Sequence, residues 1–280
     1  MGRKNSIRRR QHAHKPARQF DKYEYYLNSV QAPDTDVVFM RDTYKELRKK
    51  KPHTLREDFC GTFSISCEWA KLNREHFAYG VDIDPEPLEY GRSFYLPQLT
   101  RQQQERVDII CESVLSHDLP KVDIIAAFNF SYFIFKERKI LLDYFTNCYR
   151  TLNKEGLLVA DCFGGSLCNS PNKEKTKHKG FIYEWEQESF DTITNHARYN
   201  INFKLDTEKF WRKQVFTYDW RMWSIPELKD IMADAGFKKT HVYWEQADAS
   251  GEGTGDFIRQ QTQAPDDQCD AWVAYVVGEK

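Results

Sequence analysis

The chain has 280 residues, of which 40% are hydrophobic, and a formal net charge of −1. This length and composition suffice to bury the core of one domain with an attached lobe. No apolar run approaches the roughly 20 residues that cross a bilayer, and the N-terminal segment has no apolar stretch of the kind found in secretory signals, so we expect a cytoplasmic protein without a membrane partner.

Residues 1–20 form a basic segment that we predict to be a flexible tail. It holds seven lysine and arginine residues and no acidic residue, which leaves 34 basic and 42 acidic residues, a net charge of −8, in the rest of the chain. A solvated tail without a partner is the simpler interpretation. Contact with RNA or another polyanion is the alternative, although the acidic body would repel nucleic acid elsewhere.

Residues 21–52 are predicted to form a helical cover with helices over 21–31 and 34–50. The second helix carries apolar residues at helical spacing: Val37, Met40, Tyr44 and Leu47. Side chains with this spacing share one face of a helix, so we expect that face to pack on the main domain.

Strands and helices alternate from residue 54 onward. We predict strands near 54–59, 77–83, 107–112, 122–130 and 157–163, and helices near 64–73, 85–96 and 137–152. Several of the strands are nearly continuous apolar runs, such as residues 122–128, and are therefore apolar on both faces. Strands of this kind separated by helices indicate a parallel sheet that is covered on both sides.

The pattern changes after the fifth strand. Residues 166–223 are polar and aromatic, and we expect them to form an inserted β-rich lobe. Its predicted parts are antiparallel strands near 181–186, 198–203 and 214–220, and a charged loop over 173–179.

A capping box marks the start of the last helix, because Ser224 and Glu227 stand three residues apart around a proline. Strands near 238–246 and 271–277 follow, separated by a glycine-rich loop over 251–256. Residues 53–165 and 224–280 are therefore expected to form one α/β domain. Its core would be a doubly wound, mostly parallel seven-stranded sheet with helices on both faces.

The turn after the first strand is the most informative local feature. Cys60, Gly61 and Thr62 open the following helix, and small residues at a helix start leave backbone N–H groups free for a polar or anionic ligand group. Asp82 follows Gly61 by 21 positions, close to the spacing at which a nucleotide-binding βαβ unit binds ribose hydroxyls. An NAD-dependent oxidoreductase would place Gly-x-Gly-x-x-Gly here, whereas this stretch has Gly61 alone, so that alternative is disfavoured.

The chain resembles the class I S-adenosylmethionine-dependent methyltransferases over roughly residues 55–278. The resemblance is carried by four segments: 57–62 (Glu-Asp-Phe-Cys-Gly-Thr), 80–82 (Gly-Val-Asp), 122–132, and 152–158 (Leu-Asn-Lys-Glu-Gly-Leu-Leu). It implies a Rossmann-like fold, S-adenosylmethionine as the cofactor and methyl transfer as the reaction. Phe59 and Phe63 depart from the family pattern, which commonly has glycines at these positions.

The resemblance also implies which residues hold the cofactor. At the methionine end of the cofactor, Glu57 or Asp58 would bind the ammonium group, and the N–H groups of Cys60, Gly61 and Thr62 would bind the polar tail. At the nucleoside end, Asp82 would bind both ribose hydroxyls, Ile83 would pack on the adenine face, and Glu112 and Ser113 would contact the adenine amino edge. The carbonyl groups of Phe128 and Asn129 would face the sulfonium. The sequence shows neither a metal-ligand spacing nor a Ser/His/Asp arrangement. Methyl transfer needs mainly positioning and the exclusion of water.

Residues 129–132 (Asn-Phe-Ser-Tyr) lie where the fourth strand should deliver side chains to the reacting methyl group. Amine-methylating enzymes that act on nucleic acid bases often carry Asn-Pro-Pro-Tyr at this position; there the Asn oxygen and a carbonyl hold the amine and the aromatic ring stacks on the base. Asn129 and Tyr132 keep the ends of that pattern and are our candidates for acceptor positioning. A strand end at which Asn129 only caps the next turn is the alternative.

The predicted lobe is rich in aromatic residues, and a lobe inserted here typically shapes the acceptor pocket in this family. Glu184, Glu186 and Glu188 alternate on one side of a strand, where they either attract an amine or form a solvated sheet face. We expect methyl transfer to a nucleophilic nitrogen or oxygen of a small molecule, because the body is acidic and no nucleic-acid-binding module is present. A protein or RNA methyltransferase that uses the basic tail, and a non-catalytic S-adenosylmethionine-binding protein, are the alternatives.

Overall fold

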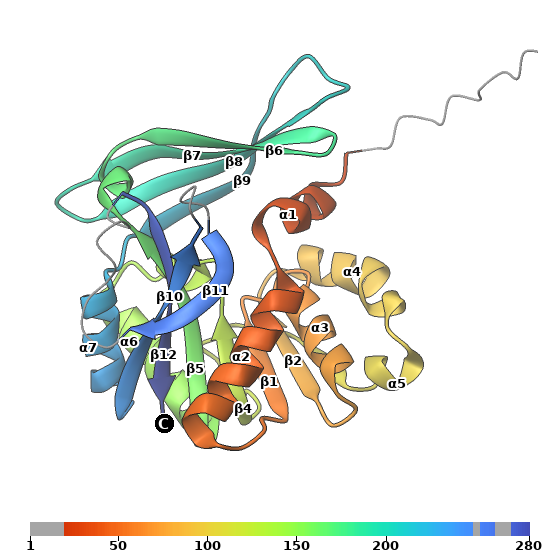
Figure 1. Cartoon of the computed structure of the whole chain (residues 1–280), viewed down its shortest axis with the longest axis vertical. Coiled ribbons are helices and arrows are strands. Elements are labelled where there is room, and N and C mark those ends of the chain that lie inside the picture. The colour runs from red at the N-terminus through yellow and green to blue at the C-terminus, as the bar shows by residue number, and fades with distance from the viewer. Residues whose placement is uncertain (1–19, 249–252, 261–269) are drawn as a thin grey trace, which may run out of the picture.

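The computed structural model describes residues 20–248, 253–260 and 270–280, and two β-sheets organise them (Figure 1). The larger sheet has eight strands in the order β11-β10-β12-β5-β4-β1-β2-β3, and the smaller has four in the order β6-β7-β8-β9. The small sheet lies across one end of the large sheet, at the top of Figure 1. Of the predicted basic tail, Phe20 alone belongs to the described residues.

Five parallel strands form the centre of the large sheet. They are β1 (Thr54–Asp58), β2 (Phe77–Asp82), β3 (Val107–Cys111), β4 (Val122–Ala127) and β5 (Leu152–Gly164). From β1 the chain runs outward to β2 and β3, and it then returns to the other side of β1 as β4 and β5. Open α/β sheets bind ligands at the carboxyl ends of the strands where the order reverses in this way.

Antiparallel strands complete the large sheet. They are β12 (Trp272–Glu279) beside β5, then β10 (Lys239–Ala247), and β11 (Gly253–Gln260) at the edge. The prediction of a doubly wound, mostly parallel sheet is confirmed, but the predicted number of strands is wrong, since the described residues hold eight rather than seven. Residues 253–256, predicted as loop, begin β11, whose pairing with β10 comes from tertiary context and not from local strand propensity. Residues 251–252 of that loop lie outside the described residues.

Helices cover both faces of the large sheet, which explains the apolar runs in its strands. They are α2 (Pro33–Arg48), α3 (Ser64–Leu72), α4 (Pro85–Phe94), α5 (Arg101–Gln104), α6 (Arg138–Thr151) and α7 (Ile225–Asp234). In β4, Ile124 and Ala126 share a buried cluster with α2 and α3, whereas Ile125 and Ala127 share one with α6 and α7. Successive side chains of a strand point to opposite faces, so both sets must be apolar when both faces are covered.

Two local predictions for the helices are confirmed. Val37, Met40 and Tyr44 of α2 are buried in the cluster that this helix shares with α3 and the sheet. Ser224 and Glu227 form both hydrogen bonds of a capping box at the start of α7. Among the described residues, no helix combines the length and the apolarity needed to cross a membrane.

The small sheet is the inserted lobe. Its antiparallel strands are β6 (Asn172–His178), β7 (Phe181–Asp191), β8 (His196–Leu205) and β9 (Arg212–Arg221). The prediction of a charged loop over 173–179 is wrong, because residues 173–178 form the edge strand β6. Lys173 and Lys175 lie on its outer face, where they form ion pairs with Glu186 and Glu184 of β7.

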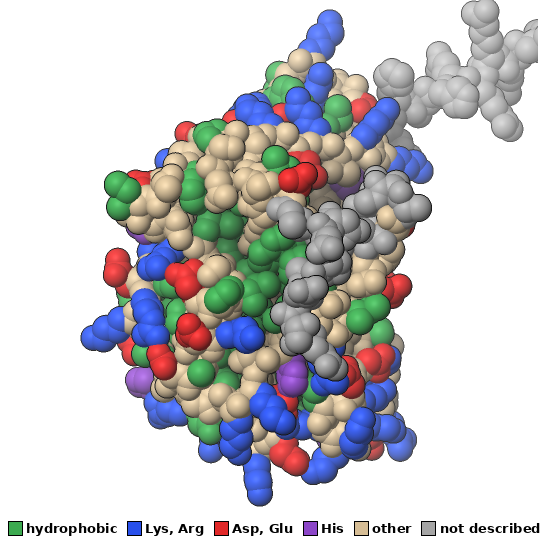
Figure 2. Space-filling view, turned by 60° about the vertical axis from the view of Figure 1, so that its left-hand side comes forward, with side chains coloured by type: hydrophobic (Ala, Val, Ile, Leu, Met, Phe, Trp, Pro, Cys, Tyr) green, Lys and Arg blue, Asp and Glu red, His purple; other side chains and the backbone are tan. Residues whose placement is uncertain are grey.

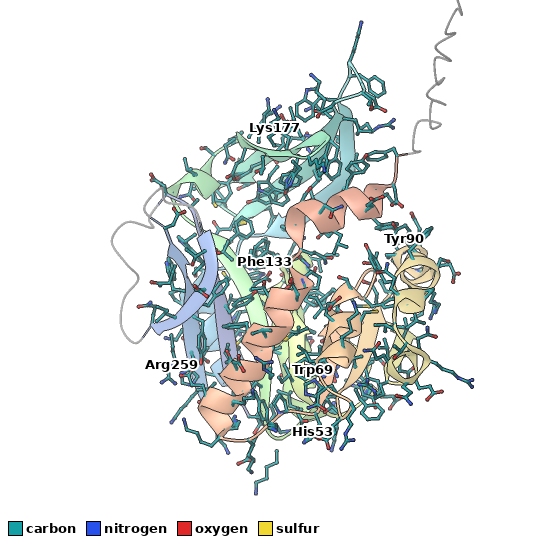
Figure 3. All side chains as sticks on the ribbon, turned by 45° about the vertical axis from the view of Figure 1, so that its right-hand side comes forward. His53, Trp69, Tyr90, Phe133, Lys177 and Arg259 are labelled. Carbon is teal, nitrogen blue, oxygen red and sulfur yellow. The ribbon has the colours of Figure 1, made fainter. Side chains whose placement is uncertain are left out.

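A short helix, α1 (Lys22–Val30), bridges the lobe and the main domain (Figures 1 and 3). Tyr25 packs edge-on against Phe181 of the lobe, with ring centroids 4.8 Å apart. On the other side, the hydroxyl of Tyr90 in α4 donates to the carboxylate of Asp21 at 2.7 Å. The helix therefore spans the carboxyl ends of the parallel strands.

Candidate functional site

The turn after β1 keeps the backbone conformation of a glycine-rich loop although two of its residues are phenylalanines. Phe59, Gly61 and Phe63 have φ angles of 57°, 52° and 50°, in the left-handed region that costs a residue with a Cβ roughly 1–2 kcal/mol. The Phe63 ring is fully buried, and a Cβ on Gly91 of α4 would come within 2.4 Å of it. Packing therefore holds the turn in a shape that glycine adopts freely. Sequence reasoning missed Gly91, for which a glycine inside a helix was the signal.

Asp82 at the end of β2 is tied to this turn. The N–H of Gly61 donates to Oδ2 at 2.7 Å, and the N–H of Asp84 donates to Oδ1 at 2.9 Å. Burial raises the pKa of Asp82, and the two backbone donors act in the opposite direction. The structure thus brings together the turn and the acid that the sequence pairs, and it fixes the orientation of the carboxylate.

The expectation that three N–H groups of the turn are free for a ligand needs correcting. The N–H of Cys60 donates to the carbonyl of Val81 at 3.0 Å, and that of Gly61 is used by Asp82. Within the described residues no acceptor is found for the N–H of Thr62. The N–H groups of Cys60 and Gly61 are thus used in contacts with β2, and only the N–H of Thr62 is left to bind a ligand.

The residues predicted on the adenine side lie at neighbouring strand ends. Ile83, directly after Asp82, is 72% exposed. Glu112 and Ser113 follow Cys111, the residue that pairs with Asp82 in the sheet. Glu112 is exposed and Ser113 half-buried, so both are accessible beside β2.

Asp58 does not reach a ligand site. Its side chain is fully buried, forms two hydrogen bonds with Arg56 at 2.7 and 3.0 Å, and accepts a third from the Tyr144 hydroxyl at 2.9 Å. The prediction that Asp58 binds the cofactor ammonium is therefore corrected. Adjacent strand residues point to opposite faces, and Asp58 points into the core between the sheet and α6.

Glu57 faces the other side and belongs to a group of buried acids near the turn. Its Oε2 accepts hydrogen bonds from the N–H and the hydroxyl of Ser66 at 2.7 and 2.6 Å, and burial raises its pKa to about 8. Asp36 of α2, which sequence reasoning missed, accepts from the Tyr275 hydroxyl at 2.8 Å, and burial raises its pKa to about 6. These hydrogen-bond partners are neutral, so the region is suited to a cationic group.

A second left-handed turn follows β4. Asn129 and Phe130 both have φ of 56°, and their N–H groups donate to the two oxygens of Asp161 at 2.6 and 2.9 Å. Asp161, in β5 beside the end of β4, is buried, and burial raises its pKa to about 8. Sequence reasoning missed this clamp, for which the signal was a lone acid inside the apolar run of β5.

Tyr132 is not placed for contact with an acceptor. Its side chain is fully buried and its hydroxyl donates to the backbone carbonyl of Asp161 at 2.7 Å. Without the two prolines of the related motif, the chain after Phe130 enters a short 3-10 helix (Ser131–Ile134), which turns the Tyr132 ring into the core. We therefore leave Tyr132 out of the proposed site, and Phe130 is the aromatic residue beside Asn129.

The carbonyl of Phe128, predicted to face the sulfonium, is used within the protein. It accepts hydrogen bonds from the hydroxyl of Ser131 at 2.9 Å and from the N–H of the same residue at 3.4 Å. The side chain of Asn129 is half-buried and forms no hydrogen bond within the described part of the chain. Asn129 thus remains available at the end of β4.

An aromatic cavity of about 760 Å³ lies between the lobe and the carboxyl ends of the large sheet. Asn129 lines it, together with a set of aromatic side chains from the lobe, α1 and the strand ends: Tyr26, Phe130, Phe163, Tyr183, Trp185, Tyr199, Tyr218, Trp220 and Trp272. Figure 2 shows hydrophobic side chains gathered between the lobe and the main domain. The volume suits a small molecule, since ligand cavities commonly measure about 300–1,000 Å³.

The glutamate row predicted in the lobe lies on the face opposite the cavity. Glu184 forms ion pairs with Lys175 and Lys213, Glu186 with Lys173, and Glu188 with Arg198. These ion pairs indicate that the three glutamates belong to a charged outer face of the sheet and do not form an amine-binding row.

Comparisons with known proteins agree with this architecture. No protein-family model matches the chain, and no curated protein matches its sequence. Among solved structures, an S-adenosylmethionine-dependent methyltransferase from Clostridium acetobutylicum is similar with 14% identity and a TM-score of 0.62, covering 91% of this chain and 96% of its own. The amino pentose methyltransferase CalS10 from Micromonospora echinaspora is similar with 13% identity and a TM-score of 0.63, covering 94% and 99%. The sugar N-methyltransferase KedS8 from Streptoalloteichus is similar with 14% identity and a TM-score of 0.61, covering 100% and 98%. The fold implied by the sequence resemblance is therefore confirmed.

Proposed function

We propose that this protein is an S-adenosylmethionine-dependent methyltransferase that acts on a nucleophilic nitrogen or oxygen of a small molecule. The observation that carries the proposal is the hydrogen bond from the N–H of Gly61 to Asp82 at the ends of β1 and β2, together with a cavity that Asn129, after the neighbouring strand β4, lines. The similar solved structures named above are those of methyltransferases, and the similarity covers nearly their whole length, which supports methyl transfer as the reaction.

The described residues fit this cofactor at several points. Asp82 is oriented to accept two ribose hydroxyls, with Ile83, Glu112 and Ser113 beside it for the adenine. Thr62 offers an N–H to the carboxylate end, and the buried acids Glu57 and Asp36 favour positive charge. The backbone carbonyl of Asn129, a residue that lines the cavity, would face the sulfonium. When bound, S-adenosylmethionine supplies an electrophilic methyl group.

The protein's own part in such a reaction is positioning and the exclusion of water. The aromatic cavity would shield an acceptor partly from bulk solvent, and the carboxamide of Asn129 can accept a hydrogen bond from an acceptor N–H or O–H. Holding the two reactants in line and displacing water from between them are what such a transfer needs from the protein.

A small molecule suits the cavity better than a macromolecule. CalS10 and KedS8 are described as acting on an amino pentose and a sugar. The alternative of a protein or RNA acceptor depends on residues 1–19, which lie outside the described residues. The alternative of a non-catalytic binding protein was motivated by Phe59 and Phe63, and both take the conformation of the glycines they replace.

Calorimetry with S-adenosylmethionine tests the proposal. We expect the protein to bind it and Asp82→Ala to weaken binding at least about tenfold, because a charge-assisted hydrogen bond contributes about 1.5–3 kcal/mol. Asp108→Ala, at an exposed acid of the adjacent strand β3, is the matched control and should bind as the wild type does. A folded protein that does not bind S-adenosylmethionine would contradict the proposal.

A further inference from the structure

The inner face of the lobe sheet presents stacked rings to the aromatic cavity. Trp185 and Tyr199 stack with centroids 4.9 Å apart and an interplanar angle of 18°, and Tyr218 and Trp220 lie 4.4 Å apart. The faces of such rings are electron-rich, so they attract a cation that comes within about 6 Å of the ring centre.

The charged groups around the cavity favour the same kind of guest. Glu174, on the inward-facing side of β6, and Glu245 line the cavity. Lys173 also lines it, but its ammonium group is bound to Glu186 on the outer face at 2.8 Å. Two carboxylates thus line the cavity, while the lysine that lines it is paired on the outer face, which disfavours a carboxylate or phosphate guest.

The phenol of Tyr26 and the thiol of Cys168, which line the cavity, are poor bases for a hydroxyl acceptor. A hydroxyl group must lose its proton as it is methylated, which requires a base near the reacting oxygen. Burial raises the pKa of Tyr26 to about 12 and that of Cys168 to about 11, so both stay protonated at neutral pH. No histidine lines the cavity in the described part of the chain. A neutral amine attacks through its own lone pair and has no such requirement.

We propose that the acceptor is an amine carried on an apolar or aromatic body, a proposal that rests on the proposed function and narrows it. The lone pair of the acceptor nitrogen forms the new N–C bond while the C–S bond breaks and its electron pair stays on sulfur. The positive charge thereby passes from sulfur to nitrogen, into the field of the rings and carboxylates. An acceptor that arrives as an ammonium ion first loses one proton to water.

Probes that differ in one functional group test this proposal in the complex with S-adenosylhomocysteine. We would measure the binding of 2-phenylethylamine, 2-phenylethanol and 3-phenylpropionate by calorimetry. The amine should bind about threefold to thirtyfold more tightly than the alcohol, the range expected for a cation over aromatic rings. The carboxylate should bind most weakly.

Matched variants on the two faces of the same sheet localise the effect. Trp185→Leu and Glu174→Gln should each weaken amine binding about threefold or more. Trp211→Leu and Glu188→Gln alter residues that contact the outer-face cations Lys175 and Arg198, and they should leave amine binding unchanged. Equal or tighter binding of the carboxylate, or equal losses from both faces, would overturn the proposal. If S-adenosylhomocysteine itself does not bind, the proposed function fails; if it binds and the amine is not preferred, this inference alone fails.

Discussion

Asp161 holds two consecutive left-handed residues, Asn129 and Phe130, by their N–H groups. Left-handed conformations of residues with a Cβ persist where surrounding contacts determine them, so we assign Asp161 a positioning role for the floor of the cavity. It need not touch a ligand to have this effect.

Asp161→Asn tests the clamp, because a carboxamide can accept from one of the two N–H groups but opposes the other. We expect a loss of about 1–3 kcal/mol in the free energy of unfolding, the cost of an unsatisfied buried donor. We also expect weaker binding of 2-phenylethylamine to the S-adenosylhomocysteine complex. Tyr132→Phe is the control: it loses one hydrogen bond, about 1 kcal/mol, and should bind the amine as the wild type does. Equal amine binding by all three proteins would rule out the positioning role.

Gly91 lies against the first turn, where a Cβ would meet the Phe63 ring and the Thr62 carbonyl, both at 2.4 Å. Gly91→Ala should therefore lower the free energy of unfolding by about 1–3 kcal/mol through overpacking and weaken S-adenosylmethionine binding through displacement of the turn. Urea denaturation and calorimetry measure the two effects. Ser93→Ala, at an exposed position of the same helix, should change neither, and similar behaviour of the two variants would contradict the argument.

The sequence identified part of the site, for reasons that lie in single residues. Gly61 and Asp82 could be paired because strand ends in a βαβ unit meet at one edge. The exclusion of Asp58 could not be foreseen, since which of two adjacent acids faces the core depends on the position of Arg56 and Tyr144. Contacts made through backbone N–H groups mark only the residue that accepts them, here Asp161 as a lone acid in an apolar run, and not the residues that donate.

At the scale of elements, α1 depends on contacts with other elements for its stability. It has nine residues and none of them is fully buried, and isolated helices of this length are marginal in water. Its position depends on contacts with the lobe and with α4, among them the Tyr90–Asp21 hydrogen bond that joins it to the main domain (Figure 3).

Tyr90→Phe removes that hydrogen bond, and we expect the amide hydrogens of α1 to exchange about fivefold to tenfold faster, in line with about 1 kcal/mol for one hydrogen bond. Hydrogen exchange followed by mass spectrometry measures this. Tyr95→Phe, at the end of the same helix α4, leaves the bond to Asp21 in place and is the control. Unchanged exchange in Tyr90→Phe would show that the aromatic contacts with the lobe suffice.

The elements that the sequence predicted well are those whose pattern follows from their own burial. Residues 122–128 read as a strand because both faces of β4 are covered. The strand β6 was missed because its residues are mostly charged and polar, and it becomes a strand through pairing with β7 and through ion pairs such as Lys175–Glu184. Edge strands of this kind are specified by their neighbours and not by local propensity.

At the scale of the whole molecule, buried acids make stability depend on pH. Burial raises the pKa of Glu57 and Asp161 to about 8 and that of Asp36 to about 6. A carboxyl group whose pKa is raised on folding binds its proton more tightly in the folded state. Its contribution is complete below the unfolded pKa and is lost as the pH rises through the folded pKa.

We therefore expect the free energy of unfolding to fall between pH 5.5 and pH 8, by about 3 kcal/mol for each of Glu57 and Asp161, since one pKa unit corresponds to about 1.4 kcal/mol. Urea denaturation at the two pH values measures this. Glu57→Gln should reduce the slope, whereas Glu188→Gln, at an exposed acid, should keep it. A stability that rises with pH over this range would contradict the assignment.

The left-handed phenylalanine at position 63 has a consequence for how this protein can change. Phe63 belongs both to the turn and to a buried cluster with Cys67, Leu88 and Leu99, so the shape of the turn follows the packing of that cluster. A substitution that repacks Leu99 should therefore change both the stability of the fold and the proposed binding of the cofactor at the turn. A glycine at position 63 would separate these two effects.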